Sequence, residues 1–152
     1  MNRIIQYLWP IAISMFVGVL ASKLQRDGID NWYPFLHRPH IIPSRKTFGL
    51  VWTALYILIG LSMGRIISRP DCRIARREWW AQLALCFLWS VCFFVLHEML
   101  WAMGVLLLLG VTVLDYVIIT FRRDIVAALC FIPYLAWVAF CCYLNGVIYI
   151  YN

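Results

Sequence analysis

Charged residues are scarce in this sequence. Asp, Glu, Lys and Arg together make up 13% of its 152 residues, and hydrophobic types make up 64%. Soluble globular proteins contain roughly a quarter charged and about half apolar residues. A water-soluble fold of this length could not bury so much apolar surface, so the composition excludes an ordinary soluble domain. It predicts an integral membrane protein surrounded by the lipid bilayer.

The sequence also lacks the patterns of a metal site or a covalent catalyst. Its six cysteines form no C-x-x-C pair and no zinc-ligand spacing, and no nucleophile–base pair is evident. Five of the cysteines lie inside apolar runs, where a thiol is usually a small buried hydrophobe: Cys86, Cys92, Cys130, Cys141 and Cys142. We therefore predict no metal, no cofactor and no catalytic residue.

The net charge of +6 raises the alternative of a nucleic-acid-binding protein. The basic residues, however, lie in the gaps between apolar runs, as they do in the cytoplasmic loops of membrane proteins. If every run crosses the membrane, eight basic residues share the side of the N-terminus and five lie on the other side. This count predicts a cytoplasmic N-terminus, an outward C-terminus and no nucleic-acid partner.

Five long apolar runs are present. Each approaches the 20 or so residues that a spanning helix needs, and continuous runs favour helices over the alternating strands of a membrane barrel. The predicted fold is an all-α integral membrane protein, a bundle of five transmembrane helices in one domain, residues 1–152. The helices are expected at about residues 4–24, 47–66, 79–97, 101–121 and 125–149. A cleaved signal peptide is the alternative for the first run, but its length and Pro10 favour an uncleaved span.

The connections between these runs are unequal. Residues 25–46 are rich in aromatics and prolines and poor in Gly and Ser, which predicts a stiff lid folded over the helix ends. Residues 65–78 are expected to form a plain basic loop. The turn at His97 and Glu98 is so short that the helices on either side must be antiparallel neighbours.

Three tryptophans lie deep within apolar runs: Trp52, Trp89 and Trp137. Trp usually collects at the membrane interface. The tryptophans near run ends fit that role: Trp9, Trp32, Trp79 and Trp80. Membrane helices normally pack through small residues, as Gly60 and Gly64 would allow within or between subunits. The three deep rings are compatible with core packing, but they also favour a cavity for a flat apolar ligand.

Asp115 is the one charge inside a predicted span. It lies seven residues from Arg122, about 10 Å along a helix, which favours an ion pair or a helix-packing hydrogen bond over a role in ligand or proton binding. In the lid, His37 and His40 are candidate haem ligands and Arg38 is a candidate partner for a propionate. A simple polar loop is the alternative for these three.

Four strings stand out between residues 32 and 145. They are Trp32-Tyr33…Leu36-x-x-x-His40-x-x-Pro43, Val51-Trp52-x-x-Leu55-Tyr56, Gln82-Leu83-x-Leu85-x-x-x-Trp89-Ser90-x-x-Phe93-Phe94 and Pro133-Tyr134-Leu135-Ala136-Trp137-Val138-x-Phe140-x-x-x-Leu144-Asn145. In order and spacing they resemble the TspO family of tryptophan-rich sensory proteins, which includes the mitochondrial translocator protein. The last string is the specific part of the match.

The resemblance implies a five-helix homodimer with a ligand cavity inside the bundle, closed by the lid. It implies a receptor, sensor or carrier for porphyrins such as protoporphyrin IX, haem-like tetrapyrroles and related flat ligands. The residues it places in the cavity are Trp52, Tyr56, Cys86, Trp89, Ser90, Phe93, Tyr134, Trp137, Cys141 and Leu144. Those in the lid are Trp32, Tyr33, His37, Arg38 and Pro43. The expected location is the inner (cell) membrane of a bacterium or the mitochondrial outer membrane of a eukaryote.

The chain departs from the family pattern at several positions. Cys86 stands where the family commonly has asparagine, and Cys141 occupies an alanine-like site. The C-terminus lacks the final basic residue of the sterol-contact pattern, which argues against sterol binding. The alternatives are a light- and oxygen-dependent porphyrin-degrading enzyme, driven by the photochemistry of the pigment, and a dimeric structural scaffold. A small multidrug exporter is disfavoured because the first helix has no acidic residue.

Overall fold

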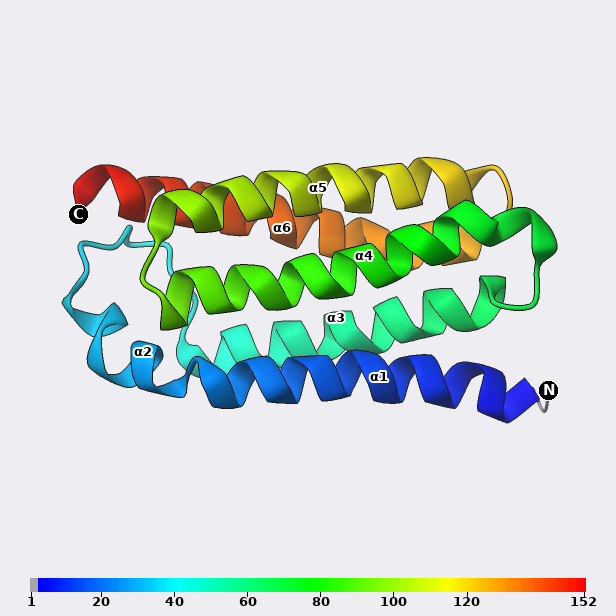
Figure 1. Cartoon of the computed structure of the whole chain (residues 1–152), viewed down its shortest axis with the longest axis horizontal. Coiled ribbons are helices and arrows are strands. Elements are labelled where there is room, and N and C mark those ends of the chain that lie inside the picture. Colours follow the sequence, from blue (N-terminus) through cyan, green and yellow to red (C-terminus); the bar gives the residue numbers. More distant parts are fainter. Residues whose placement is uncertain (1–2) are drawn as a thin grey trace.

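The computed structural model describes residues 3–152, and this range contains five long helices and no strand. The helices run side by side along the long axis of the molecule (Figure 1). Their bounds are α1 Arg3–Leu24, α3 Arg45–Ile66, α4 Arg73–Ser90, α5 Met99–Phe121 and α6 Ile125–Tyr151. Together with the short turns that extend α4, each is long and apolar enough to cross a membrane. The predicted five-span, all-α membrane fold is confirmed.

The plain basic loop predicted at residues 65–78 is mostly helical. α3 continues to Ile66, and a 3-10 turn, η2 (Pro70–Cys72), leads directly into α4. The first residues of α4 include Arg, Ala and Glu, which favour helix, and Arg76 donates a hydrogen bond to the carbonyl of Arg69 at 2.5 Å. The prediction was wrong because a loss of hydropathy marks where a span leaves the lipid, and a helix can continue beyond that point.

At its other end, α4 continues as a π-helix, η3 (Val91–Val95). The chain then reverses at His97, whose φ of 59° lies in the left-handed region that few residues other than glycine adopt. Because this turn is tight, α4 and α5 pack against each other as the antiparallel neighbours that the sequence predicts. α5 also packs along α6, and α1 packs along α3.

α1 and α3 approach closely through two glycines of α3. A Cβ on Gly60 would lie 2.5 Å from the backbone nitrogen of Ile11, and a Cβ on Gly64 would overlap the ring of Tyr7. Gln6 adds a hydrogen bond from its side-chain Nε2 to the carbonyl of Gly64 at 2.6 Å. The two glycines therefore form a contact within one chain, in the half of α3 that lies away from the lid.

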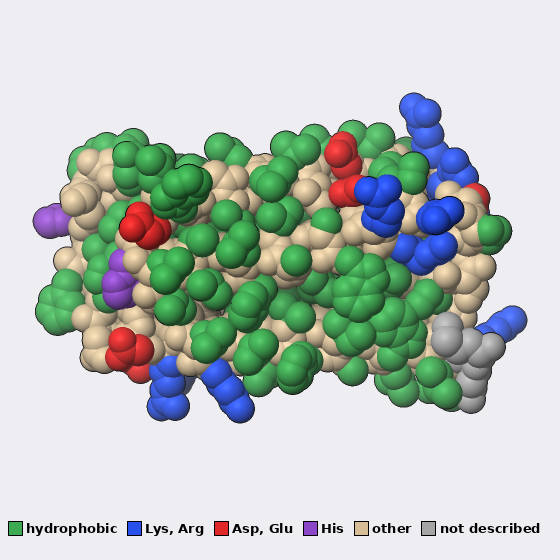
Figure 2. Space-filling view, in the orientation of Figure 1, with side chains coloured by type: hydrophobic (Ala, Val, Ile, Leu, Met, Phe, Trp, Pro, Cys, Tyr) green, Lys and Arg blue, Asp and Glu red, His purple; other side chains and the backbone are tan. Residues whose placement is uncertain are grey.

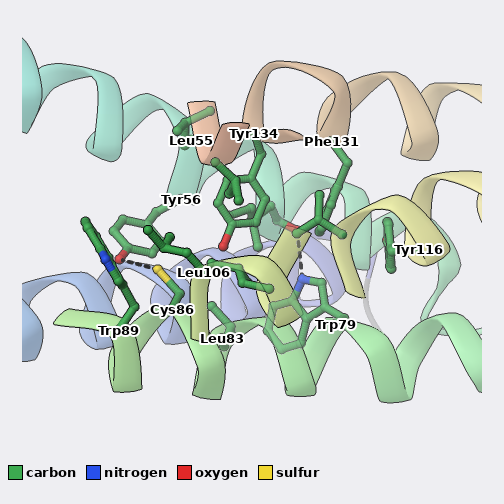
Figure 3. Close-up of a cluster of buried hydrophobic side chains, with 14 of the residues drawn as sticks. Leu55, Tyr56, Trp79, Leu83, Cys86, Trp89, Leu106, Tyr116, Phe131 and Tyr134 are labelled. Atoms are coloured by element: carbon green, nitrogen blue, oxygen red, sulfur yellow. Dashed lines mark hydrogen bonds between the residues drawn. The ribbon is translucent and has the colours of Figure 1, made fainter. Parts of the chain in front are cut away.

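Side-chain hydrogen bonds hold the same half of the bundle together. Ser62 donates to the carbonyl of Ala127 and shares a hydrogen bond with the hydroxyl of Tyr116, each at 2.7 Å. The indole N–H of Trp79 donates to the carbonyl of Ile59 at 2.9 Å (Figure 3). Because the Trp79 side chain is fully buried, the interface role predicted for it is wrong. Its N–H is satisfied by the backbone of α3, so it needs no contact with water.

Hydrophobic side chains cover the middle of the molecule, and Lys and Arg gather toward its ends (Figure 2). At the end that carries the N-terminus, Arg65 and Arg69 both pair with Asp124, at 2.8 and 3.7 Å. Asp124 also caps α6, because its carboxylate accepts a hydrogen bond from the N–H of Ala127 at 3.0 Å. One carboxylate thus joins the end of α3 to the start of α6.

The contacts of the Asp115 side chain differ from those predicted. Its side chain is exposed on α5, and within residues 3–152 it forms neither a salt bridge nor a side-chain hydrogen bond. The predicted ion pair with Arg122 is therefore absent. The helical spacing allows the two side chains to share a face, but it does not fix their rotamers.

We expect Asp124→Asn to lower the thermal stability of the protein and Asp124→Ala to lower it further. Asparagine still caps the helix but loses both ion pairs, whereas alanine also loses the cap, a further loss of about 1 kcal/mol. Burial would raise the pKa of Asp124, but hydrogen bonds from Arg65 and from the Ala127 N–H outweigh it and hold that pKa below its ordinary value.

Because the pKa of Asp124 is lowered in the folded state, its stabilising contribution is complete above the pKa of an unfolded Asp, about 3.9. The contribution is lost as the pH falls further, through the pKa of the folded protein. Melting curves in detergent between about pH 7 and about pH 2 test this prediction. The difference in melting temperature between the parent and Asp124→Asn must narrow at acidic pH. A constant difference would show that the carboxylate charge does not contribute to stability.

Candidate ligand-binding site

The segment between α1 and α3 folds over the end of the bundle that carries the C-terminus (Figure 1). It contains a short helix, α2 (Arg26–Asn31), and a 3-10 turn, η1 (Tyr33–Phe35), followed by irregular chain up to Ser44. We call this segment the lid. The sequence predicts a stiff lid here, and the short helix and turn give its aromatic side chains fixed positions.

The lid is seated on the turn between α4 and α5. Gly28 lies so close to the backbone carbonyl of Phe94 that no Cβ would fit there. Trp32 stacks on the ring of His97, with ring centroids 4.1 Å apart and planes at 17°. It also contacts Phe93 edge-on at 5.5 Å. Trp32 is thus packed between the lid and the turn that joins α4 to α5.

The far part of the lid is held by the last residue of the chain. The N–H of His37 donates to Oδ1 of Asn152 at 2.8 Å, and Nδ2 of Asn152 donates to the carbonyl of His37 at 3.0 Å. The guanidinium of Arg38 lies 5.1 Å from the ring centre of Tyr33. Burial raises the pKa of the Tyr33 phenol, and the Arg38 charge opposes that shift. Tyr33, Arg38 and Pro43 line a cavity of about 300 Å³ under the lid.

An aromatic wall extends below the lid. Trp52 of α3 and Trp89 of α4 are stacked, with ring centroids 6.0 Å apart and planes at 27°. Tyr56 lies one helical turn after Trp52, on the same face of α3, with its ring 5.6 Å from that indole. Its hydroxyl contacts the thiol of Cys86 at 3.6 Å (Figure 3). The facing sides of α3 and α4 thus present one continuous aromatic surface.

This wall borders a cavity of about 410 Å³ between α1, α3 and α4, which we call the main cavity. Its volume falls within the range of small-molecule sites, about 300–1,000 Å³. Five residues predicted for the site line it: Trp52, Tyr56, Cys86, Trp89 and Ser90. The hydroxyl of Ser90 donates to the side-chain oxygen of Gln25 at 2.6 Å. Half of the predicted site is therefore brought together around one space.

The other half lies toward α6. Phe93, Cys141 and Leu144 line a much smaller cavity of about 20 Å³, together with Tyr33 of the lid and with Trp89. That space holds little more than a water molecule. Trp89 and Phe48 line both cavities, so these two side chains lie between them.

Tyr134 and Trp137 of α6 line none of these three cavities. Tyr134 is fully buried and contacts Trp52 edge-on at 6.2 Å. Trp137 packs against Phe48 at 5.5 Å. The two rings therefore support the aromatic wall from behind, and the aromatic lining of the main cavity comes from α3 and α4.

The α1 side of the main cavity is missing from the predicted site. The residues that form it are Met15, Gly18, Val19, Ala21, Ser22 and Lys23, followed by Gln25. Phe48, Gly49 and Thr53 complete the lining from α3. One signal was available in the sequence: Gly18 lies inside a helix, where glycine costs about 1 kcal/mol relative to alanine. Its Cβ would overlap the ring of Tyr56, so the glycine marks a close contact between α1 and the aromatic wall.

One buried polar atom beside the main cavity is available to a ligand. Within residues 3–152, Trp89 Nε1, Trp137 Nε1 and Asn145 Oδ1 are buried without a hydrogen-bond partner. Buried polar groups are almost always paired, so each such exception needs an explanation. Of these residues, Trp89 borders the main cavity, and its N–H can donate to an acceptor on a bound molecule. The site can thus hold a flat, mainly apolar ligand that carries an acceptor atom.

Comparison with known proteins adds independent evidence. The family model described as the TspO/MBR family matches residues 10–150. A tryptophan-rich protein TspO from Archaeoglobus fulgidus is 29% identical over 153 residues, covering 99% of each chain. A tryptophan-rich sensory protein from Cereibacter sphaeroides is 34% identical over 108 residues, 71% of this chain and 68% of the relative. The human translocator protein is 29% identical over 141 residues, 88% of this chain and 80% of the relative.

Proposed function

Because this chain belongs to the TspO/MBR family of integral membrane proteins, we propose that it is a membrane receptor or carrier that binds tetrapyrroles, such as protoporphyrin IX, in the main cavity. The observation that carries the proposal is the stacked pair of Trp52 and Trp89 on the wall of a space of about 410 Å³. Two nearly parallel indoles offer the broad apolar surface that a planar macrocycle covers.

The chemistry of the lining supports a flat ligand over a compact polar one. Stacking of an aromatic ring on another π-system contributes about 0.5–1.5 kcal/mol in addition to the burial of apolar surface area. The buried lining groups of the wall include a phenol, a thiol and an indole N–H, on Tyr56, Cys86 and Trp89. They can orient a macrocycle through a few polar contacts without offering the dense hydrogen bonding that a sugar or a nucleotide requires.

The proposal is tested by titrating the detergent-purified protein with protoporphyrin IX while recording Trp fluorescence in the dark. We expect saturable quenching, because the ligand would lie against Trp52 and Trp89. Empty detergent micelles supply the background, and heat-unfolded protein supplies a control for non-specific quenching. Quenching that grows linearly with porphyrin, and to the same extent in unfolded protein, would support the dimeric scaffold instead.

The same protein–porphyrin sample also tests the enzymatic alternative. Loss of the porphyrin absorption bands under light and oxygen, faster with folded than with unfolded protein, would identify a porphyrin-degrading enzyme. Stable bands together with saturable quenching support a receptor or carrier. The homodimer and the cytoplasmic N-terminus remain predictions, the first from the family resemblance and the second from the count of basic residues.

A further inference from the structure

The main cavity reaches the outer surface of the bundle between α1 and α3. These helices are in contact at Gly60, but nearer the lid a Cβ on Gly49 would meet no atom within 4 Å. The exposed residues that line the cavity on this side are Val19, Ser22, Lys23, Gly49 and Thr53. We call them the side opening. The two helices thus close the cavity at one end and leave it accessible from the side at the lid end.

One charge stands at the side opening. Lys23 is the only ionisable Lys, Arg, His, Asp or Glu among the residues that line the main cavity, and it belongs to the last turn of α1. Within residues 3–152 it takes part in no salt bridge. The acidic residues that follow it in the chain have other partners. Asp27 accepts from Asn31, and Asp30 pairs with Arg26 and Arg45.

An unpaired ammonium beside an aromatic cavity selects a particular kind of molecule. The long apolar stem of a lysine can lie along the cavity rim while its charged end stays near water. A carboxylate placed there forms a charge-assisted hydrogen bond, which is stronger than a neutral one. The other lining groups near the rim, the Ser22 and Thr53 hydroxyls, are uncharged and do not repel an anion.

We infer that Lys23 binds the carboxylate of a flat acidic ligand whose apolar body lies on Trp52 and Trp89. This inference rests on the proposed function and assigns the acidic group a defined place. Because Lys23 is at the lid end of α1, the acidic edge of the ligand points toward the membrane surface and its apolar part toward the bilayer centre. The protein therefore distinguishes a tetrapyrrole acid from its uncharged ester.

The test compares protoporphyrin IX with its dimethyl ester, which has the same macrocycle but no carboxylate. We expect the parent protein to bind the acid about tenfold more tightly than the ester, the effect of one hydrogen bond to a charged group. Lys23→Met should lower the affinity for the acid to that for the ester and leave ester binding unchanged. Lys23→Arg keeps the charge and should keep the preference for the acid.

The sequence offers a matched control. It contains two lysines, and the second, Lys46, is also exposed but lines none of the three cavities. Lys46→Met should retain the preference, which separates a specific contact from a general loss of positive charge. If Lys23→Met still prefers the acid, the inference is overturned while the binding function stands. If neither the acid nor the ester binds saturably to the parent, the proposed function itself fails.

Discussion

Alanine in place of Trp52 is expected to weaken the binding of protoporphyrin IX about tenfold or more, which corresponds to 1.4 kcal/mol or more. Stacking of a flat heterocycle on an aromatic side chain is worth about 1–3 kcal/mol when it is removed by alanine substitution. Trp52 is also the central ring of the wall. It contacts Trp89, Tyr56 and Tyr134 at 6.0, 5.6 and 6.2 Å. The substitution removes one of the two rings expected to contact the ligand. It also loosens the packing of the other ring, Trp89.

The measurement is the porphyrin titration. Binding is monitored through the porphyrin absorption bands, so that the loss of a fluorescent Trp does not distort the result. Trp101→Ala is the matched control, because Trp101 is 72% exposed on α5 and lines none of the three cavities. Trp137→Ala should have an intermediate effect, because Trp137 supports Phe48 from behind. If Trp52→Ala binds as tightly as Trp101→Ala in protein that elutes as folded, the ligand does not lie in the main cavity.

The contrast between Trp52 and Trp137 shows what the sequence could predict of the site. The one-turn spacing of Trp52 and Tyr56 placed both rings on one face of α3, and the structure finds both beside the main cavity. The family resemblance also placed Tyr134 in the cavity, but Tyr134 is fully buried and lines none of the three cavities. The spacing of residues within one helix does not predict which neighbouring helix covers a given face of it. Tyr134 is covered by Trp52, so it supports the wall and has no access to the main cavity.

The α1 wall could not be predicted for a different reason. Residues such as Met15 and Val19 are ordinary lipid-facing types, and nothing in their local pattern distinguishes a cavity lining from a membrane surface. Their role depends on how α1 crosses α3. The span itself was predictable, because its length and unbroken hydropathy follow from the thickness of the bilayer. The bilayer constrains the length and composition of a span much more than it constrains helix pairing.

The largest expected effect on stability comes from the point where α1 and α3 cross. Leucine in place of Gly60 should destabilise the protein by about 3 kcal/mol or more, because overpacking costs about 1–3 kcal/mol even where side chains can adjust. Here the obstacle is backbone, since the first carbon of the new side chain would lie 2.5 Å from the backbone nitrogen of Ile11. α1 must move away from α3 to make room, which would also break the hydrogen bond between Gln6 and Gly64.

Gly104→Leu is the control for this prediction, because it makes the same substitution inside another spanning helix where a Cβ would meet no atom within 4 Å. Both variants gain the same helix propensity, about 0.8–1 kcal/mol, so their difference isolates the contact with α1. A loss of about 3 kcal/mol lowers the melting temperature by about 6–12 °C in a chain of this size. Equal melting temperatures for the two variants would mean that α1 does not press on α3 at Gly60. Because Met15, Val19 and Lys23 reach the main cavity from α1, displacing that helix should weaken porphyrin binding in Gly60→Leu and leave it unchanged in Gly104→Leu.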